Sequence, residues 1–300
     1  MFPYYTLILL ATLLFGANFV CNDVYRRERG SSVVISLQFT VISCSVSTLF
    51  FLAISGFRFD CTWFLFLLAL VGAVNSFLFS LCTFKSLGII NLSLYSLFSM
   101  LGGMVLPFLQ GIIFFGEAVT VANLICFLLI VFALVLTVEK NGDKKGGTLY
   151  YVGVFVFNGM SGVLAKILNA APFDKGTVPA VSYSVLSGFL SILLSGLLLF
   201  YFTEKHPEKL PPMSLRSNIV CAGSGVINRV ANYMLVIALL HVPSSVQYPM
   251  VTGGVMIVST LACFIMKNKP SKKEVISVAI AFIALVILVL PSLNIKLFCI

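Results

Sequence analysis

Arg229 is the residue whose type and position point most clearly to chemistry. It lies near the middle of an apolar stretch, 13 residues after Arg216 and 12 before His241. A helix through this stretch would place Arg229 roughly 18 to 20 Å from either end, too far for its side chain to reach water comfortably. A guanidinium in the centre of a membrane costs at least about 3 kcal/mol. We therefore expect Arg229 either to be satisfied by other groups of the protein or to bind a ligand.

Two interpretations of Arg229 are open. No Asp or Glu falls in the middle of an apolar stretch, and the nearest case, Asp23, lies at the end of one. Backbone carbonyls and amides such as Asn228 and Asn232 could satisfy the guanidinium, which would make it structural. Alternatively, Arg229 faces a wet cavity and binds a carboxylate or phosphate group of a substrate. The functional prediction rests on this second interpretation.

Polar side chains near Arg229 could complete a binding site. Residues four apart share a helix face, so Arg229 lies beside Tyr233, and Asn228 beside Asn232. The next stretch and the first half of the chain supply further candidates. The predicted substrate-binding residues are Arg229, Asn228, Asn232, Tyr233, Gln247, Tyr248, Thr252, Asn18, Asn75, Tyr95 and Asn158. Each Asn or Tyr could instead form a hydrogen bond between helices.

The elements that carry these residues are membrane spans. Hydrophobic residues make up 60% of the 300 residues and charged residues 10%, whereas a soluble domain has roughly 25% charge. Apolar runs near 20 residues, long enough to cross a bilayer, recur along the chain. The sequence predicts an all-α integral membrane protein with ten transmembrane helices at 4–22, 33–55, 63–84, 92–115, 120–138, 148–168, 178–202, 216–240, 244–266 and 274–290.

The distribution of Lys and Arg predicts the orientation. Fourteen of them lie in the loops after the first, third, fifth, seventh and ninth spans, and three lie in the other loops and tails. The positive-inside rule therefore puts the odd loops in the cytoplasm and both termini outside, in a multi-pass protein of the cell membrane. The net charge of +9 then indicates contact with lipid headgroups and no nucleic-acid partner.

The chain divides into two halves at the polar loop Glu139–Gly147. A shift of 151 residues aligns the pair Gly102-Gly103 with Gly253-Gly254, and pairs each loop that has more Lys and Arg in one half with a loop that has fewer in the other. That reversal is expected of an inverted repeat. The sequence therefore predicts a first five-helix repeat at 1–140, a cytoplasmic linker at 141–147 and a second repeat at 148–300, around a central cavity.

Enzymatic activity is not predicted. The chain has no HExxH, GxSxG or Walker motif, and its eight cysteines are scattered without a CxxC pair. We therefore expect no catalytic residues, no metal site and no cofactor.

The chain resembles the drug/metabolite transporter superfamily, in its ten-helix EamA-like branch. The resemblance rests on FGANF in the first span (15–19), on the glycine-interrupted fourth and ninth spans, and on Gly116-Glu117 before the fifth. The second half has Lys267-Asn268-Lys269-Pro270 at that turn, without the glutamate. Membership would imply alternating access and substrates among amino acids, metabolites and drugs.

The sequence thus predicts a transporter of a small anionic or zwitterionic solute, such as an amino-acid-like metabolite, moved outward. A cationic solute is disfavoured, because Arg229 is central and the first span lacks the membrane glutamate that cation-exporting relatives use. The alternatives are a nucleotide-sugar or sugar-phosphate exchanger, for which more than one buried cation is expected, and a membrane receptor or assembly protein that transports nothing. The oligomeric state is left open.

Overall fold

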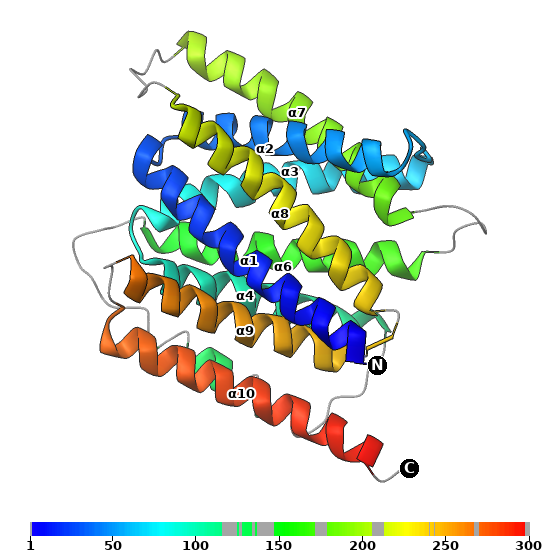
Figure 1. The fold of residues 1–300 in the computed structure, drawn as a ribbon, viewed down its shortest axis with the longest axis vertical. Coiled ribbons are helices and arrows are strands. Elements are labelled where there is room, and N and C mark those ends of the chain that lie inside the picture. The colour runs from blue at the N-terminus through cyan, green and yellow to red at the C-terminus, as the bar shows by residue number, and fades with distance from the viewer. Residues whose placement is uncertain are drawn as a thin grey trace.

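The chain folds as a bundle of helices that run roughly parallel or antiparallel to one another (Figure 1). The computed structural model describes residues 2–115, 125, 128–133, 136, 147–171, 179–205, 213–239, 241–242, 244–266 and 270–297, and no strand occurs in these ranges. Its helices are α1 (Phe2–Arg29), α2 (Val33–Ile54), α3 (Trp63–Leu87), α4 (Leu92–Phe115), α6 (Gly147–Ala170), α7 (Pro179–Lys205), α8 (Leu215–Leu239), α9 (Ser244–Ile265) and α10 (Lys272–Leu297).

These helices lie at nine of the ten ranges that the sequence predicts as spans. The fifth range, 120–138, lies mostly outside the described residues, as do Gly116-Glu117, Lys267-Asn268-Lys269 and the linker except for Gly147. Two helices continue seven residues past their predicted ends, α1 to Arg29 and α10 to Leu297. The added turns of α1 are stabilised by ion pairs from Arg26 and Arg27 to Asp23, three and four residues earlier.

The helices have the character of membrane spans. Six described helices, α1, α2, α3, α4, α6 and α7, are long and apolar enough to cross a bilayer. Their polarity is reversed relative to a water-soluble bundle. In α7, for example, Leu193 and Leu197 are exposed, whereas Ser187, Ser191 and Ser195 are buried. An apolar outer surface around a polar interior is expected of a multi-pass membrane protein.

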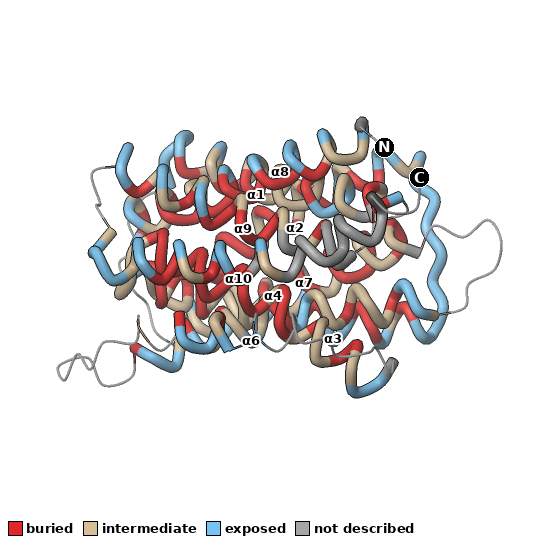
Figure 2. The backbone as a smooth tube through the Cα atoms, turned by 90° about the horizontal axis from the view of Figure 1, so that it is seen from below, coloured by how far each residue is buried: buried red, intermediate tan, exposed pale blue. Residues whose placement is uncertain are grey.

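Helices from the two halves of the chain alternate in space. α1 packs against α8 on one side of the bundle, and α3 packs against α6 on the opposite side (Figures 1 and 2). α2 packs against α7, and α4 packs against α6 and α9. The helices that would form one predicted repeat therefore make most of their contacts with the other repeat, so the space at the centre belongs to both.

Basic residues gather at one end of the bundle, where α1 ends and α2 begins, which we call the basic end (Figure 1). The described Lys and Arg at this end are Arg26, Arg27, Arg29, Lys85, Lys205, Arg216, Lys272 and Lys273. The opposite end, where α2 ends and α3 begins, holds Arg58, Lys166 and Lys296 in its described part. The described Lys and Arg are thus concentrated at one end of the bundle.

Candidate functional site

A cavity of about 400 Å³ lies inside the bundle. Side chains from α1, α2, α3, α4, α6, α7, α8 and α9 line it, so both halves of the chain contribute. It extends from the middle of the bundle toward the end opposite the basic end, because its lining includes Asn169 and Ala180, near the end of α6 and the start of α7. A volume of this size suits a small organic molecule.

Ten of the eleven predicted site residues line this cavity. They are Asn18, Asn75, Asn158, Asn228, Arg229, Asn232, Tyr233, Gln247, Tyr248 and Thr252. Tyr95 lies behind the wall instead: it is fully buried, and its hydroxyl is 3.1 Å from that of Thr83, which does line the cavity. The structure thus brings together residues up to 234 positions apart in the sequence, from Asn18 to Thr252. Their role in binding a substrate stays a prediction.

Arg229 is half-buried on α8 and carries the positive charge of this wall. Its guanidinium lies beside the Cys44 thiol of α2 and acts electrostatically on Tyr183 of α7. Among the described residues it forms no ion pair with a carboxylate. The two neighbouring amides are engaged with each other, since Asn232 Nδ2 donates to the backbone oxygen and Oδ1 of Asn228 at 2.8 and 2.9 Å. The charge therefore has no acidic counterpart within the described part of the wall.

Several other amides in the wall join neighbouring helices. Asn75 Nδ2 of α3 donates to the Phe157 carbonyl and to Ser161 Oγ of α6, at 3.0 and 2.9 Å. Asn158 Nδ2 donates to the Ser99 carbonyl of α4 at 2.6 Å. Gln247 Nε2 of α9 donates to the Leu235 carbonyl of α8 at 3.0 Å. These residues hold the helices that frame the cavity, which was the structural alternative for them.

One such contact lies in the cavity wall on the side of the basic end. The Ser224 hydroxyl of α8 lies 2.6 Å from Asn18 Oδ1 and 2.9 Å from Asn22 Oδ1 of α1. A hydroxyl has one hydrogen, so it donates to one amide while the other amide can turn and donate from its nitrogen. The three side chains form a buried hydrogen-bonded cluster between α1 and α8.

Sequence reasoning missed the serines of the wall, although it predicted the hydroxyl-bearing residues Tyr233, Tyr248 and Thr252. Nine serines line the cavity: Ser43, Ser47, Ser76, Ser80, Ser161, Ser184, Ser187, Ser191 and Ser224. A signal for them is present in the spacing. In α2 the lining residues Ser43 and Cys44 lie three and four residues after Thr40, and Ser47 lies four and three residues after them, which is one face of a helix. A small polar stripe inside an otherwise apolar helix marks a face turned toward a polar interior.

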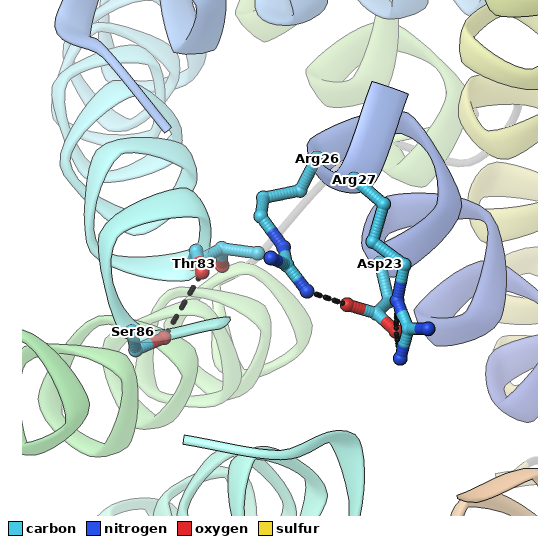
Figure 3. Close-up of polar contacts among 5 residues, drawn as sticks. All are labelled: Asp23, Arg26, Arg27, Thr83 and Ser86. Atoms are coloured by element: carbon cyan, nitrogen blue, oxygen red, sulfur yellow. Dashed lines mark hydrogen bonds and ion pairs between the residues drawn. The ribbon is translucent and has the colours of Figure 1, made fainter. Parts of the chain in front are cut away.

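The basic end contains a buried ion-pair cluster on α1. Asp23 is 1% exposed, and its carboxylate accepts from Arg26 Nη2 at 2.6 Å and from Arg27 Nε at 2.9 Å. Figure 3 shows Asp23 between the two guanidinium groups, with Arg26 reaching toward the part of α3 that carries Thr83 and Ser86. The carboxylate at the end of the first predicted span is thus neutralised locally and lies outside the cavity wall.

Lys166 lies near the end of α6, half-buried, where the sequence predicts that it reaches toward water. Its ammonium group is 3.4 Å from the carbonyl oxygen of Pro107 in α4. A proline within a helix leaves backbone carbonyls in the preceding turn without their usual partner and favours a bend there. Lys166 therefore contacts the neighbouring helix as well as lying near its own helix end.

Comparison with known proteins supports the fold but assigns no family. No family model and no curated protein matches the chain. A solved structure described as "Crystal structure of protein" is similar to it with a TM-score of 0.63 and 14% sequence identity, covering 97% of this chain and 99% of that one. At this identity the similarity concerns the fold alone. The arrangement of helices found here, over nearly its full extent, therefore occurs in another protein of similar length.

Proposed function

We propose that this chain is a membrane transporter of the EamA-like drug/metabolite kind, which moves a small anionic or zwitterionic organic solute outward by alternating access. The observation that carries the proposal is the Arg229 guanidinium on the wall of a cavity between the two halves, without a carboxylate partner among the described residues. A buried cation of this kind is stabilised by an anionic group of a ligand.

The packing of the helices supports two inverted repeats of five spans. A two-fold relation that exchanges α1 with α6, α2 with α7, α3 with α8 and α4 with α9 would turn the α1–α8 contact into α6–α3, α4–α6 into α9–α1, and α3–α7 into α8–α2. Both members of each pair are present among the packed helices. Under this proposal the fifth span is the range 120–138 and α10 is its counterpart.

Glycines at the closest helix contacts follow the same relation. A Cβ atom at Gly102 would collide with the backbone of Phe155, where α4 meets α6. At the related α1–α9 contact, a Cβ at Gly254 would lie 2.5 Å from Thr12 Cγ2. Gly225 of α8 likewise lies against the backbone of Ser43 in α2. Small residues that let helices approach closely are typical of packing between membrane spans.

Charge supports the orientation in the cell membrane. The basic end would be cytoplasmic under the positive-inside rule, with both termini outside. The lining residue Asn169, toward the opposite end, is exposed, whereas Asn22, Thr83 and Phe84, on the side of the basic end, are buried. We therefore assign this conformation to a state accessible from outside. A fluorescent protein that matures only in the cytoplasm, fused to the C-terminus, should stay dark; a bright fusion would contradict the orientation.

The single charge of the wall favours a small acid over larger phosphorylated solutes. Arg229 is the only Lys or Arg among the described residues that line the cavity. A nucleotide-sugar or sugar-phosphate exchanger would have to stabilise two or more negative charges. One guanidinium, surrounded by amide and hydroxyl groups, suits one carboxylate and a polar remainder, as in an amino acid.

Flux of carboxylate-bearing solutes into proteoliposomes tests this function. Arg229→Gln should reduce transport of the best solute by roughly 10- to 100-fold, the cost of losing a charge-assisted hydrogen bond, and Arg229→Lys should restore part of it. Lys272→Gln, which removes an exposed charge at the basic end, is the matched control. Equal flux for wild type and Arg229→Gln would refute the proposed role of Arg229, and absence of any flux would favour a receptor or assembly protein.

A further inference from the structure

The interface between α1 and α8 contains polar groups at intervals from the cavity to the basic end. On α1, Asn18, Asn22, Tyr25 and Arg29 are spaced by four, three and four residues, which places them on one face. On α8, Ser217, Cys221 and Ser224 repeat at the same intervals. The two helices run in opposite directions, so the faces meet in register: Asn22 contacts Ser224, Tyr25 packs with Cys221, and Glu28 accepts from Ser217.

Arg29, in this interface, has hydrogen-bond donors that are buried without a partner. It is 3% exposed, and its Nη2 donates to Gln38 Oε1 of α2 at 2.8 Å. Its Nε and Nη1 are buried without a hydrogen-bond partner. The Tyr25 hydroxyl lies near the guanidinium, but no hydrogen bond of ordinary geometry joins the two, and this hydroxyl is buried without a partner as well. Two guanidinium N–H groups and one phenol hydroxyl thus lie close together, and none of them forms a hydrogen bond with a described residue.

The acidic groups nearby are already engaged. Asp23 is held by Arg26 and Arg27. Glu28 accepts from Arg216 Nε at 3.1 Å and from Ser217 Oγ at 2.8 Å. In the described part of the basic end, neither carboxylate is paired with Arg29. Among the described residues its positive charge is therefore buried without an ion-pair partner, and an anion would stabilise this arrangement.

Arg29 lies further along α1 than the cavity wall, on the side of the basic end. Asn22 and Ser224 belong to the cavity wall, and Tyr25 and Cys221 lie three residues further toward the basic end. Arg29 is seven residues from Asn22, which corresponds to roughly 10 Å along the helix. A solute that leaves the cavity between α1 and α8 would pass from Arg229 through the amide cluster to Arg29.

We propose that Arg29 and Tyr25 form a second anion-binding site, between α1 and α8, that takes the carboxylate or phosphate group of the solute on the basic-end side of the cavity. The proposal rests on the proposed function for the identity of the anion as a transported solute. Binding requires α1 and α8 to separate, since the unpartnered atoms are buried in the present conformation. The Glu28 contacts to α8 would break in the same step.

Anion binding to the purified protein tests the site without requiring transport. In phospholipid-free detergent and an Arg229→Gln background, inorganic phosphate and then acetate are titrated at constant ionic strength, and the thermal unfolding midpoint is followed. We expect a saturable rise in the midpoint. Adding Arg29→Gln should weaken the apparent affinity by roughly 10- to 100-fold, whereas adding Lys272→Gln, the control for surface charge, should leave it unchanged.

Tyr25→Phe keeps the test decisive if Arg29→Gln does not fold. The Tyr25 hydroxyl has no partner in this structure, so its removal should leave the fold intact, while a role in binding predicts an affinity about tenfold lower. An anion-dependent rise in the unfolding midpoint that neither Arg29→Gln nor Tyr25→Phe changes would refute the site. So would no response to either anion, or one that appears only with phosphatidylglycerol, which would assign the charge to a lipid headgroup.

The outcomes also separate this site from the proposed function. Arg29-dependent anion binding in a protein that moves no carboxylate solute would keep the anion site and refute the transport role. Flux without any Arg29-dependent binding would keep the transport role and refute the second site.

Discussion

The α1–α8 and α3–α6 interfaces, which the proposed repeat makes equivalent, begin alike at the cavity and then differ. Each has an amide–serine hydrogen bond at the cavity wall, Asn22 with Ser224 in one and Asn75 with Ser161 in the other. Beyond this bond the α1–α8 interface continues with Tyr25 and Cys221, which pack in a cluster with aromatic rings of α2 and α3, and ends with the charged groups of Glu28 and Arg29. The α3–α6 interface continues with leucines, Leu68 of α3 and Leu164 of α6 among them. Two interfaces that the proposed repeat relates can therefore differ in the polarity of their side chains.

The difference has an energetic meaning. Apolar side chains between helices are held by packing, and water offers them nothing in exchange when they separate. Hydrogen-bonded and ionic groups lose less, because water replaces their partners. The α1–α8 interface is thus the one whose opening toward water costs less per contact, and it lies at the basic end, where the solute would enter or leave the cytoplasm.

Locking the α1–α8 interface should have the largest effect. Glu28→Cys and Ser217→Cys, in a variant without native cysteines, place two thiols where hydrogen-bonded side chains now meet. A short cross-linker between them should abolish flux, and reduction should restore it. Flux that persists in fully cross-linked protein would show that α1 and α8 need not separate.

Leu164→Ala should be the most destabilising single change at the α3–α6 interface. Leu164 is 4% exposed and packs in the leucine cluster, so its truncation should lower the free energy of unfolding by about 2 to 4 kcal/mol. The matched change at the α1–α8 interface, Cys221→Ala, should cost about 1 kcal/mol, because less volume is removed. Unfolding in mixed micelles measures both, and equal costs would remove the contrast in packing.

Removing each of the two serines in turn should show how much its hydrogen bonds at the cavity contribute to the free energy of unfolding. Ser224→Ala removes the group that serves both Asn18 and Asn22 and should cost about 1 to 1.5 kcal/mol. Ser161→Ala should cost about 0.5 kcal/mol, because Asn75 keeps its bond to the Phe157 carbonyl. The same micelle titration distinguishes them, and the reverse order would mean that Asn75 depends on Ser161.

Arg216→Gln should have the smallest effect. The Arg216 side chain is 75% exposed, and an ion pair exposed to this extent contributes less than about 0.5 kcal/mol. Any loss of stability should shrink further as salt is added, because exposed pairs are screened. A loss above 1 kcal/mol, insensitive to salt, would indicate that the Arg216–Glu28 pair fastens α1 to α8.

Hydrophobic runs predicted the helices well, and the position of polar residues within those runs predicted much of the cavity wall. A lone Arg229 or Asn75 in an apolar helix has only one favourable direction, toward the protein interior, so its place on the wall could be inferred. Tyr95 shows the limit of this reasoning. Its hydroxyl contacts Thr83 behind the wall, and periodicity alone does not distinguish a lining residue from one that supports it.

The chemistry of the basic end could not be predicted in the same way. Arg29 belongs to a run of basic residues after an apolar stretch, which is typical of a cytoplasmic loop. The pairing of Asp23 with Arg26 and Arg27 accompanies two more turns of α1, and these turns bury Arg29 against Gln38. That outcome depends on contacts between helices, which the sequence pattern does not contain. The serines were missed because a hydroxyl bonded to its own helix is compatible with any environment.

Hydroxyl groups give the cavity wall a property that no single residue supplies. In α2, Thr40, Ser43 and Ser47 each donate to a carbonyl oxygen three or four residues earlier in the same helix. Each oxygen keeps its lone pairs for a guest, and rotation of the hydroxyl turns the same group into a donor. Such a lining solvates its guest much as a layer of immobilised water would. The hydroxyl groups can therefore bind different uncharged groups of the guest. The fixed charge of Arg229 selects guests that carry a negative charge.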